Sequence, residues 1–190
     1  MLEAKTVYFE NPGKENTKET LKLAIQAAKT IHSKTLLLSS TTGYSAEMAL
    51  DMIDDDIKLV VIGHSFGFKE PGKNEMDPET IKRLQESKNA SVFFATHAFT
   101  GIEKSFSSKY GGMYPHRMIA DTLRIFSQGT KVIFEDMLMA ADAGLIPIHE
   151  DIVSAGGTGR GLDTAMIIKS VHAGELFHSA VKRFLCLPLK

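Results

Sequence analysis

Residues 35–46 read Thr-Leu-Leu-Leu-Ser-Ser-Thr-Thr-Gly-Tyr-Ser-Ala, an apolar run that passes into a turn crowded with hydroxyl groups. Thr35–Leu38 predicts a short buried strand, and Ser45–Ile53 predicts a helix directly after the turn. The next apolar run, Ile57–Ile62, is β-branched at its centre and does not alternate, which predicts a strand buried on both faces. A strand, a helix and a second strand in this order indicate a βαβ unit of a parallel sheet.

The same alternation continues in both directions along the chain. Further strands are expected at Thr6–Phe9, Ser91–Ala95, Asp151–Ala155, Thr164–Lys169 and Val181–Leu187. Pro188 predicts that the last of them lies at an edge of the sheet, because proline cannot donate to a ladder. We therefore expect an α/β fold, a three-layer αβα sandwich with a mostly parallel central sheet, formed as one domain by residues 1–190.

Helices are expected where apolar residues recur on one face. The first such face carries Leu21, Ala24, Ile25, Ala28 and Ile31, and Asn16 with Glu19 is a plausible capping pair in front of it. Asp77-Pro78 and Pro115 are typical helix starts, the second followed by a face with Met118, Ile119, Thr122, Leu123 and Phe126. Lys131–Ala143 reads as strand at its beginning and as helix at its end. We expect helix throughout, with Gly144 as its left-handed cap.

Composition excludes several classes of protein. A formal net charge of −1 with scattered Lys and Arg argues against a nucleic-acid binder. The single cysteine, Cys186, allows no internal disulfide and is expected to be a buried apolar residue. No signal peptide and no run of about 20 apolar residues is visible, which predicts a cytoplasmic protein without membrane contact.

Polar and small residues follow most of the predicted strands. They are Asn11 after the first strand, Ser39–Gly43 after the second, Gly63-His64 after the third, Thr96-His97 after the fourth and Gly156–Gly161 after a later one. In an open parallel sheet these carboxyl ends form a crevice in which α/β proteins bind ligands. We therefore expect a small-molecule site there.

The turn at Ser39, Ser40, Thr41, Thr42, Gly43 and Ser45 is the first candidate for anion binding. Amide groups at a helix start, together with neighbouring hydroxyls, form a natural phosphate site. The alternative is an ordinary Ser/Thr-rich turn that caps a helix. A cap needs only one hydroxyl, so the number of hydroxyls favours the anion site.

The loop Gly156-Gly-Thr-Gly-Arg-Gly161 is the second candidate. Its glycines allow close backbone approach to a ligand, and Arg160 could bind phosphate with two hydrogen bonds. Gly157, Thr158, Gly159 and Arg160 are therefore expected to close over the ligand. The spacing matches neither a Walker A motif nor a dinucleotide fingerprint. The alternative is a flexible hairpin between two strands.

Other conspicuous residues have ordinary explanations. His64, His97 and His116 are most simply polar ends of elements, and nothing in the sequence shows three or four metal ligands converging. Asp54–Asp56 reads as a solvated turn. The aromatic residues of two expected loops either stack on a ligand ring or pack their loop against the body; they are Phe66, Phe68, Phe99, Phe106 and Tyr110.

From Thr17 to Ser65 the chain resembles the C-terminal α/β domain of pyruvate kinase. The motif Ser40-Thr41-Thr42-Gly43-Tyr44-Ser45-Ala46 is similar to a family loop that reads roughly Thr-Lys-Ser-Gly-Arg-Ser-Ala and binds an effector phosphate. Gly157–Thr164 is similar to the second loop of that pocket. Thr41 and Tyr44 replace the lysine and arginine of the first loop, so the resemblance implies a single phosphate rather than a sugar bisphosphate.

The resemblance extends to free-standing proteins built on this domain without the catalytic barrel, so the chain is not expected to be a pyruvate kinase by itself. It implies a flavin mononucleotide (FMN) ligand whose phosphate lies in the hydroxyl turn, with Asn11, His64 and His97 lining the remainder. Two rivals stay open. The first is a flavin-dependent oxidoreductase or phosphotransferase using His64, His97 or Glu10. The second is a regulatory or assembly module whose loop Thr96–Met113 contacts a partner or a second copy of the chain, which would form a homo-oligomer.

Overall fold

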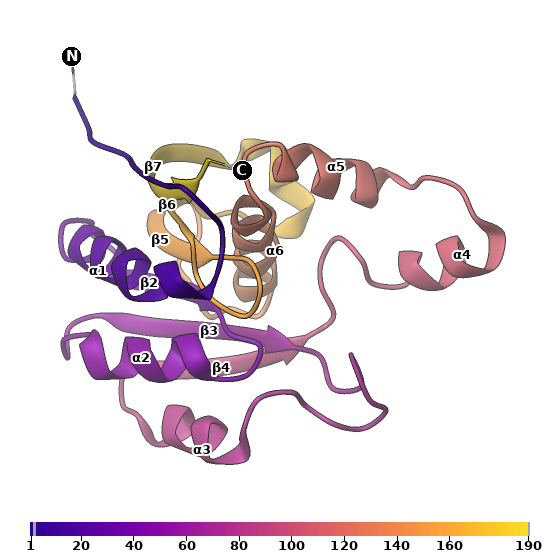
Figure 1. Ribbon diagram of the computed structural model, residues 1–190, viewed down its shortest axis with the longest axis horizontal. Coiled ribbons are helices and arrows are strands. Elements are labelled where there is room, and N and C mark those ends of the chain that lie inside the picture. Colours follow the sequence, from indigo (N-terminus) through magenta and orange to yellow (C-terminus); the bar gives the residue numbers. More distant parts are fainter. Residues whose placement is uncertain (2, 190) are drawn as a thin grey trace.

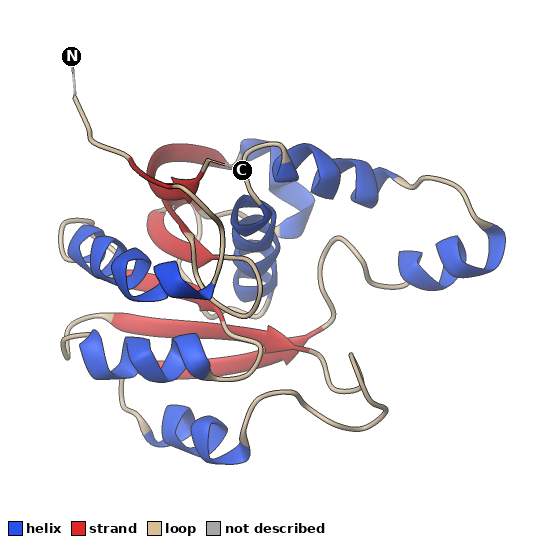
Figure 2. Cartoon of the chain, in the orientation of Figure 1, coloured by secondary structure: helices blue, strands red, loops and turns tan. Residues whose placement is uncertain are grey.

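The computed structural model describes residue 1 and residues 3–189. Its strands are β1 (Val7–Phe9), β2 (Thr35–Ser39), β3 (Lys58–His64), β4 (Ala90–Ala95), β5 (Asp151–Gly156), β6 (Thr164–Lys169) and β7 (Ala180–Pro188). Its α-helices are α1 (Thr17–Ala28), α2 (Tyr44–Met52), α3 (Pro78–Glu86), α4 (Glu103–Tyr110), α5 (Pro115–Arg124) and α6 (Gln128–Asp142). Two 3-10 helices, η1 (Lys14–Asn16) and η2 (Ala173–His178), complete it. Figure 1 labels these elements, and Figure 2 shows helices around a central sheet.

The strands form one seven-stranded sheet in the order β1-β7-β6-β5-β2-β3-β4. Four neighbouring pairs are parallel, and β6 runs antiparallel to both β5 and β7. The expected α/β fold with a mostly parallel sheet is confirmed. Because β5, β2, β3 and β4 are mutually parallel, their carboxyl ends all meet at one edge of the sheet.

Two apolar clusters, one on each face of the sheet, explain the three layers. Leu36, Leu38, Leu59 and Val61 face a cluster shared with α1, α2 and α3. The alternate residues of the same strands, among them Leu37, Val60 and Ile62, face a second cluster with α5 and α6. Side chains of a strand point alternately to its two faces. A strand that is apolar at every position is therefore buried on both faces, as the sequence of β2 and β3 predicts.

The prediction that the last strand lies at an edge is wrong. β7 pairs with β6 on one side and with β1 on the other, so the sheet ends at β1. Pro188 is tolerated because it is the final residue of β7, and the Leu189 amide beyond it donates to the carbonyl of Phe9 at 2.9 Å. The opposite edge is β4, which is only partly buried along its whole length although a buried strand was expected there.

Two local predictions also fail. Residues 96–113 do not form one long loop, because Glu103–Tyr110 is helix α4; none of its residues is buried, and the apolar pattern that marks a helix in the sequence is therefore missing. Asn16 forms no capping pair with Glu19. Asn16 has helical backbone angles itself, and its side chain donates to the carbonyl of Asn11 at 2.8 Å.

Residues 128–142 form one helix, as expected, and it is the central helix of its face. α6 is almost wholly buried, and Gly144 follows it with the positive φ of 68° that a left-handed cap requires. Asp77 caps α3 by accepting hydrogen bonds from the amides of Glu79 and Thr80. Cys186 is fully buried, and burial raises the pKa of its thiol to about 11. Within the described part of the chain, no helix is both long and apolar enough to cross a membrane.

Candidate functional site

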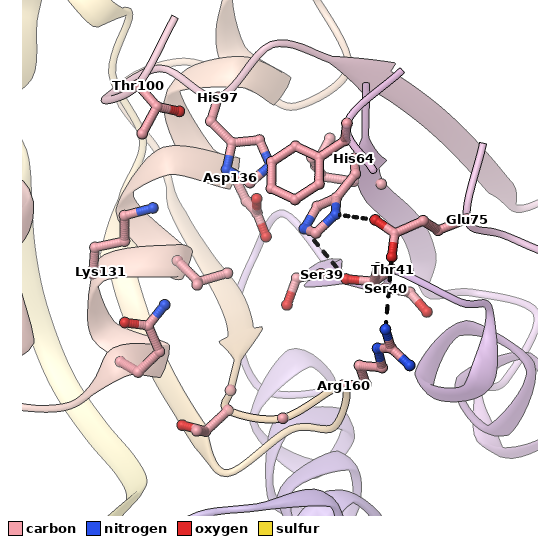
Figure 3. A pocket seen from close by; sticks show the side chains of 18 of the residues that line it. Ser39, Ser40, Thr41, His64, Glu75, His97, Thr100, Lys131, Asp136 and Arg160 are labelled. Atoms are coloured by element: carbon pink, nitrogen blue, oxygen red, sulfur yellow. Dashed lines mark hydrogen bonds and ion pairs between the residues drawn. The ribbon is translucent and has the colours of Figure 1, made fainter. Parts of the chain in front are cut away.

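A cleft of about 780 Å³ opens at the carboxyl ends of β2, β3 and β5 (Figure 3). Its floor is formed by Ser39, Gly63 and His64 at the strand ends, and its sides by the loops that follow. Residues of α4, α5 and α6 close it from the far side. Its volume lies in the range of small-molecule sites, and its place at the strand ends is the usual ligand position of open α/β sheets.

The hydroxyl loop, residues 39–45, joins β2 to the start of α2. Ser40 is buried, and its Oγ accepts a hydrogen bond from the amide of Ala46 at 3.3 Å. Gly43 has a φ of 99°, and a Cβ there would lie 2.8 Å from Thr80 Cγ2. Within the described residues, the amides of residues 42–45 donate to no protein acceptor. Ser40 therefore accepts from one amide of the first turn. The amide N–H groups of residues 42–45 remain available to a ligand at the positive end of the helix dipole.

The glycine loop, residues 157–161, connects the antiparallel strands β5 and β6, so it is the hairpin connection that the sequence offered as an alternative. It is nevertheless tightly packed. A Cβ on Gly157 would lie 2.2 Å from the carbonyl oxygen of Gly161, and one on Gly161 would lie 2.4 Å from Lys14 Cα. Arg160 has a positive φ of 67°, and its exposed side chain lines the cleft. The loop thus belongs to a hairpin and to the cleft at once.

A row of polar contacts runs from the hydroxyl loop across the cleft. The Oγ1 atom of Thr41 lies 3.4 Å from His64 Nε2, and His64 Nδ1 lies 2.8 Å from Glu75 Oε2. The other oxygen of Glu75 lies 3.8 Å from Arg160 Nη2, as the dashed lines in Figure 3 mark. Burial lowers the pKa of His64 and outweighs the hydrogen bond that His64 makes to Glu75, which raises the pKa.

A buried charged cluster sits on α6, the helix that closes the cleft. Glu135 pairs with the ammonium group of Lys131, lies 3.2 Å from His97 Nδ1 and accepts a hydrogen bond from the Phe99 amide at 3.0 Å. Burial alone would raise the pKa of Glu135, but the His97 contact and the Lys131 charge together hold it below its usual value. Three donors therefore keep this carboxylate ionised inside the protein.

Asp136, the next residue of α6, has no such support. It is 5% exposed, lines the cleft, and its Oδ2 atom has no hydrogen-bond partner among the described residues. Burial, and after it the charge of Glu135, raises the pKa of Asp136 well above its usual value. Figure 3 shows its carboxyl group pointing into the cleft. A buried polar atom without a partner is costly, and one that faces a cleft is suited to a ligand.

Basic side chains from several elements surround the cleft. Those that line it are Lys69, Lys104, Arg117, Arg124, Lys131 and Arg160, against only two lining carboxyl groups, Glu75 and Asp136. Asp121 offsets Arg124, which it contacts at 2.6 Å, and it lies 3.6 Å from Arg117. A concave surface with this excess of positive charge attracts anions, although the chain as a whole carries a net charge of only −1.

The structure brings most of the predicted site residues together. The cleft is lined by Ser39, Ser40, Thr41, Ser45, Gly63, His64, His97, Gly157, Thr158, Gly159 and Arg160. Thr42 lines a smaller adjoining hollow of about 230 Å³, which shares Lys69, Glu75 and Arg160 with the cleft. The hydroxyl loop and the glycine loop therefore lie on the same side of the molecule.

Three predicted residues do not line the cleft. Asn11 is exposed and contributes its carbonyl to the hydrogen bond with Asn16. Gly43 is buried beneath the start of α2, where it sets the backbone of the turn. Thr96 is exposed one residue before His97 and does not reach the cavity.

Sequence reasoning missed the side of the cleft that α4, α5 and α6 supply. Lys131, Glu135 and Asp136 had a detectable signal, because three charged residues interrupt a helix that is otherwise apolar and buried. Glu75, Lys104 and Arg117 had none, since each lies in a polar segment where a charged residue is ordinary.

The aromatic residues of the loops divide into two groups. Phe68 lines the cleft and stacks on His97, with ring centroids 5.5 Å apart and an interplanar angle of 20°. Phe99 is buried in the core of the α6 face, whereas Phe66, Phe106 and Tyr110 are exposed and lie outside the cleft. His64 and His97 meet with ring centroids 4.9 Å apart, yet no three His, Cys, Asp or Glu side chains of residues 1 and 3–189 are grouped to hold a metal ion.

Comparisons with known proteins concern the fold alone. No family model matches the chain. A crystal structure of pyruvate kinase from Cryptosporidium parvum matches at 12% identity and a TM-score of 0.42, covering 80% of this chain and 22% of that one. A complex of Cryptosporidium parvum pyruvate kinase with ADP matches at 12% identity and a TM-score of 0.39, covering 79% and 22%. The chain thus spans about a fifth of those proteins' length.

Proposed function

We propose that the cleft binds a small molecule that carries a phosphate group. The observation that supports this most strongly is the meeting of two distant loops, residues 39–45 and 157–161, in one cavity that also collects six basic side chains. An anion is the ligand that such a cavity would stabilise, because neither loop contributes an acidic group.

The phosphate end of the ligand belongs at the start of α2. The amides of residues 42–45 lie at the N-terminus of α2, a helix of nine residues, and donate to no acceptor among the described residues. The hydroxyls of Ser39 and Thr41 lie beside them. Arg160 approaches from the glycine loop, where its guanidinium is close enough to Glu75 to be positioned yet remains exposed to a ligand. Amides, hydroxyls and one guanidinium can together donate the hydrogen bonds that the phosphate oxygens accept, so a bound metal ion is not required.

FMN is the first ligand to test, as the resemblance implies. The cleft is large enough for a nucleotide, and the stacked pair Phe68 and His97 offers a flat surface on which a ring system can lie. Asp136 adds a buried carboxyl group to the wall of the cleft, suited to a polar group of the ligand.

The test is a titration of purified protein with FMN, followed by quenching of flavin fluorescence. Protein separated from free FMN should remain yellow, with the flavin absorbance at about 450 nm. Arg160→Ala should weaken binding about tenfold, the effect of roughly 1.4 kcal/mol. Arg83→Ala, on the outer helix α3, is the matched control and should bind like the wild type. Binding of inorganic phosphate without binding of FMN would contradict FMN as the ligand but support the phosphate site. Binding of neither compound would contradict both proposals.

A second function, assembly through residues 96–113, is favoured by a different observation. Ile102, Phe106, Tyr110 and Met113 all expose at least half of their surface around α4. Apolar side chains exposed together mark contact surfaces. Size-exclusion chromatography should then show a dimer that Phe106→Glu with Tyr110→Glu converts to a monomer, and a wild-type monomer would contradict assembly.

A further inference from the structure

Thr41, His64 and Glu75 are arranged as a hydroxyl, a base and a group that orients the base. Glu75 is a hydrogen-bond acceptor, so His64 must place its proton on Nδ1, which lies 2.8 Å from Glu75 Oε2. The lone pair of Nε2 then faces the Thr41 hydroxyl at 3.4 Å. This sequence of contacts is the one by which histidine activates a hydroxyl nucleophile, and in unliganded enzymes its first contact is often long.

The orienting group is itself held in place. Asn74 donates to the carbonyl of His64 at 3.2 Å and accepts from the amide of Met76 at 2.8 Å, so both neighbours of Glu75 are tied to the end of β3. The ring of Phe68 lies 4.0 Å from the His64 ring and covers it. A solvated surface ion pair needs no such supports, and the exposed pair His149–Glu175 elsewhere in the chain provides a comparison.

The anion site and the activated hydroxyl share one turn. Thr41 immediately precedes the free amides of residues 42–45, so a phosphate resting on those amides lies beside Thr41 Oγ1. We propose that the cleft hydrolyses a phosphate monoester, with Thr41 as the nucleophile, His64 as its base, Glu75 as the positioning residue and Asp136 as the acid for the leaving group. This inference rests on the proposed phosphate site.

The reaction balances in two steps. In the first, Thr41 Oγ1 forms a bond to phosphorus and passes its proton to His64 Nε2; the ester P–O bond breaks, and the leaving oxygen keeps the electron pair and takes a proton from Asp136. In the second, water attacks the phosphothreonine and gives a proton to Asp136. The Thr41 oxygen leaves phosphorus and recovers its proton from His64, which restores all three groups.

Asp136 is suited to the acid role by its position. Asp136 lines the cleft, and its buried Oδ2 atom has no hydrogen-bond partner in the part of the chain that the structure describes. Burial raises the pKa of Asp136 and lowers that of His64, so burial favours a protonated carboxyl group on the first and a neutral imidazole on the second. The exposed basic side chains that line the cleft, among them Lys69, Lys104 and Arg160, would offset the charge of the transferring phosphoryl group.

The experiment measures phosphate release from FMN and from 4-nitrophenyl phosphate. Thr41→Ala should lower both rates at least 100-fold, the scale of a lost nucleophile or base, whereas Thr41→Ser should stay within about tenfold of the wild type. Thr122→Ala, an exposed hydroxyl on α5, is the control and should leave both rates unchanged. Asp136→Asn should slow release from FMN more than from 4-nitrophenyl phosphate, whose leaving group departs without a proton. Mass spectrometry of quenched wild-type enzyme should find phosphate on Thr41.

Glu75 is tested by a pH profile. The groups that face His64 are Glu75, His97, Lys131 and Thr41. Glu75→Gln should lower the rate and move the acidic limb of the profile to lower pH, because the carboxylate raises the pKa of His64; Glu75→Asp should restore part of the rate. Thr41→Ala with an unchanged rate, or wild-type protein that binds FMN or phosphate without releasing phosphate, would overturn catalysis and leave binding intact. Wild-type protein that binds neither would overturn both.

Discussion

His64 Nδ1 lies 2.8 Å from Glu75 Oε2, while the opposite nitrogen of the same ring faces Thr41. The two contacts fix the ring from both sides although it lies at the end of a strand, next to solvent. They also determine which state of the histidine a measurement should find.

The first prediction concerns the pKa of His64. Burial holds it below the ordinary value of 6.5, and Glu75 partly counteracts this effect. Removing the carboxylate in Glu75→Gln should therefore lower the pKa of His64 further, because the contact that raises it is lost. Nitrogen-detected NMR titration of the histidines measures it. The matched variant Glu175→Gln should change His149 and leave His64 unaffected, and an unchanged His64 in Glu75→Gln would show that the contact is absent in solution.

The second prediction concerns stability and Asp136. Its folded-state pKa is raised, so the folded protein binds more protons than the unfolded chain, and stability is lost as the pH rises from the unfolded value of about 3.8 through the folded one. Asp136→Asn removes this loss. Its Tm at pH 8 should exceed that of the wild type by about 2–4 °C per kcal/mol regained, and the gain should shrink toward pH 4. A Tm difference that does not change with pH would contradict the assigned protonation.

The third prediction concerns salt. Exposed charges are screened strongly when the ionic strength rises from about 0.05 M to about 0.5 M. FMN affinity should therefore fall by about tenfold over that range, because several basic side chains of the cleft are exposed. Riboflavin, which lacks the phosphate, is the control: it should bind more weakly and with little salt dependence. Equal salt dependence for FMN and riboflavin would show that the phosphate of FMN does not bind among the basic side chains of the cleft.

The fourth prediction concerns the packing of the glycine loop. Gly157→Ala places a Cβ 2.2 Å from the Gly161 carbonyl oxygen, so the loop must move. The variant should lose about 1–3 kcal/mol of stability, the usual cost of overpacking, together with FMN binding. Gly174→Ala meets open space and should be nearly neutral in a urea denaturation series. A Gly157→Ala protein as stable as the wild type would show that the loop is loose.

The sequence predicted the sheet and its ligand edge because both depend on local patterns. Apolar runs without alternation identified β2 and β3, and small or hydroxyl residues after them identified the cleft. The order of the strands is a different matter. β1 and β7, from opposite ends of the chain, pair with each other, and no local pattern encodes that contact.

The far wall of the cleft could not be predicted for the same reason. Lys104 and Arg117 reach it only because α4 and α5 fold back over the strand ends, and α4 has no buried face that would mark it in the sequence. Glu75 follows a turn rich in charged residues, where nothing distinguishes the one that meets His64. Ionic contacts of this kind depend on tertiary geometry rather than on spacing.

The weak anchoring of α4 has a further consequence. Figure 1 shows this helix standing away from the body of the protein, yet Lys104 within it and Thr100 just before it line the cleft. A ligand that contacts both the strand ends and Lys104 would restrict the motion of residues 100–110. The loss of conformational entropy there would offset part of the binding free energy. Amide hydrogen exchange should accordingly slow most around residues 100–110 when the cavity is filled, and the tightness of binding can be tuned there without touching the sheet.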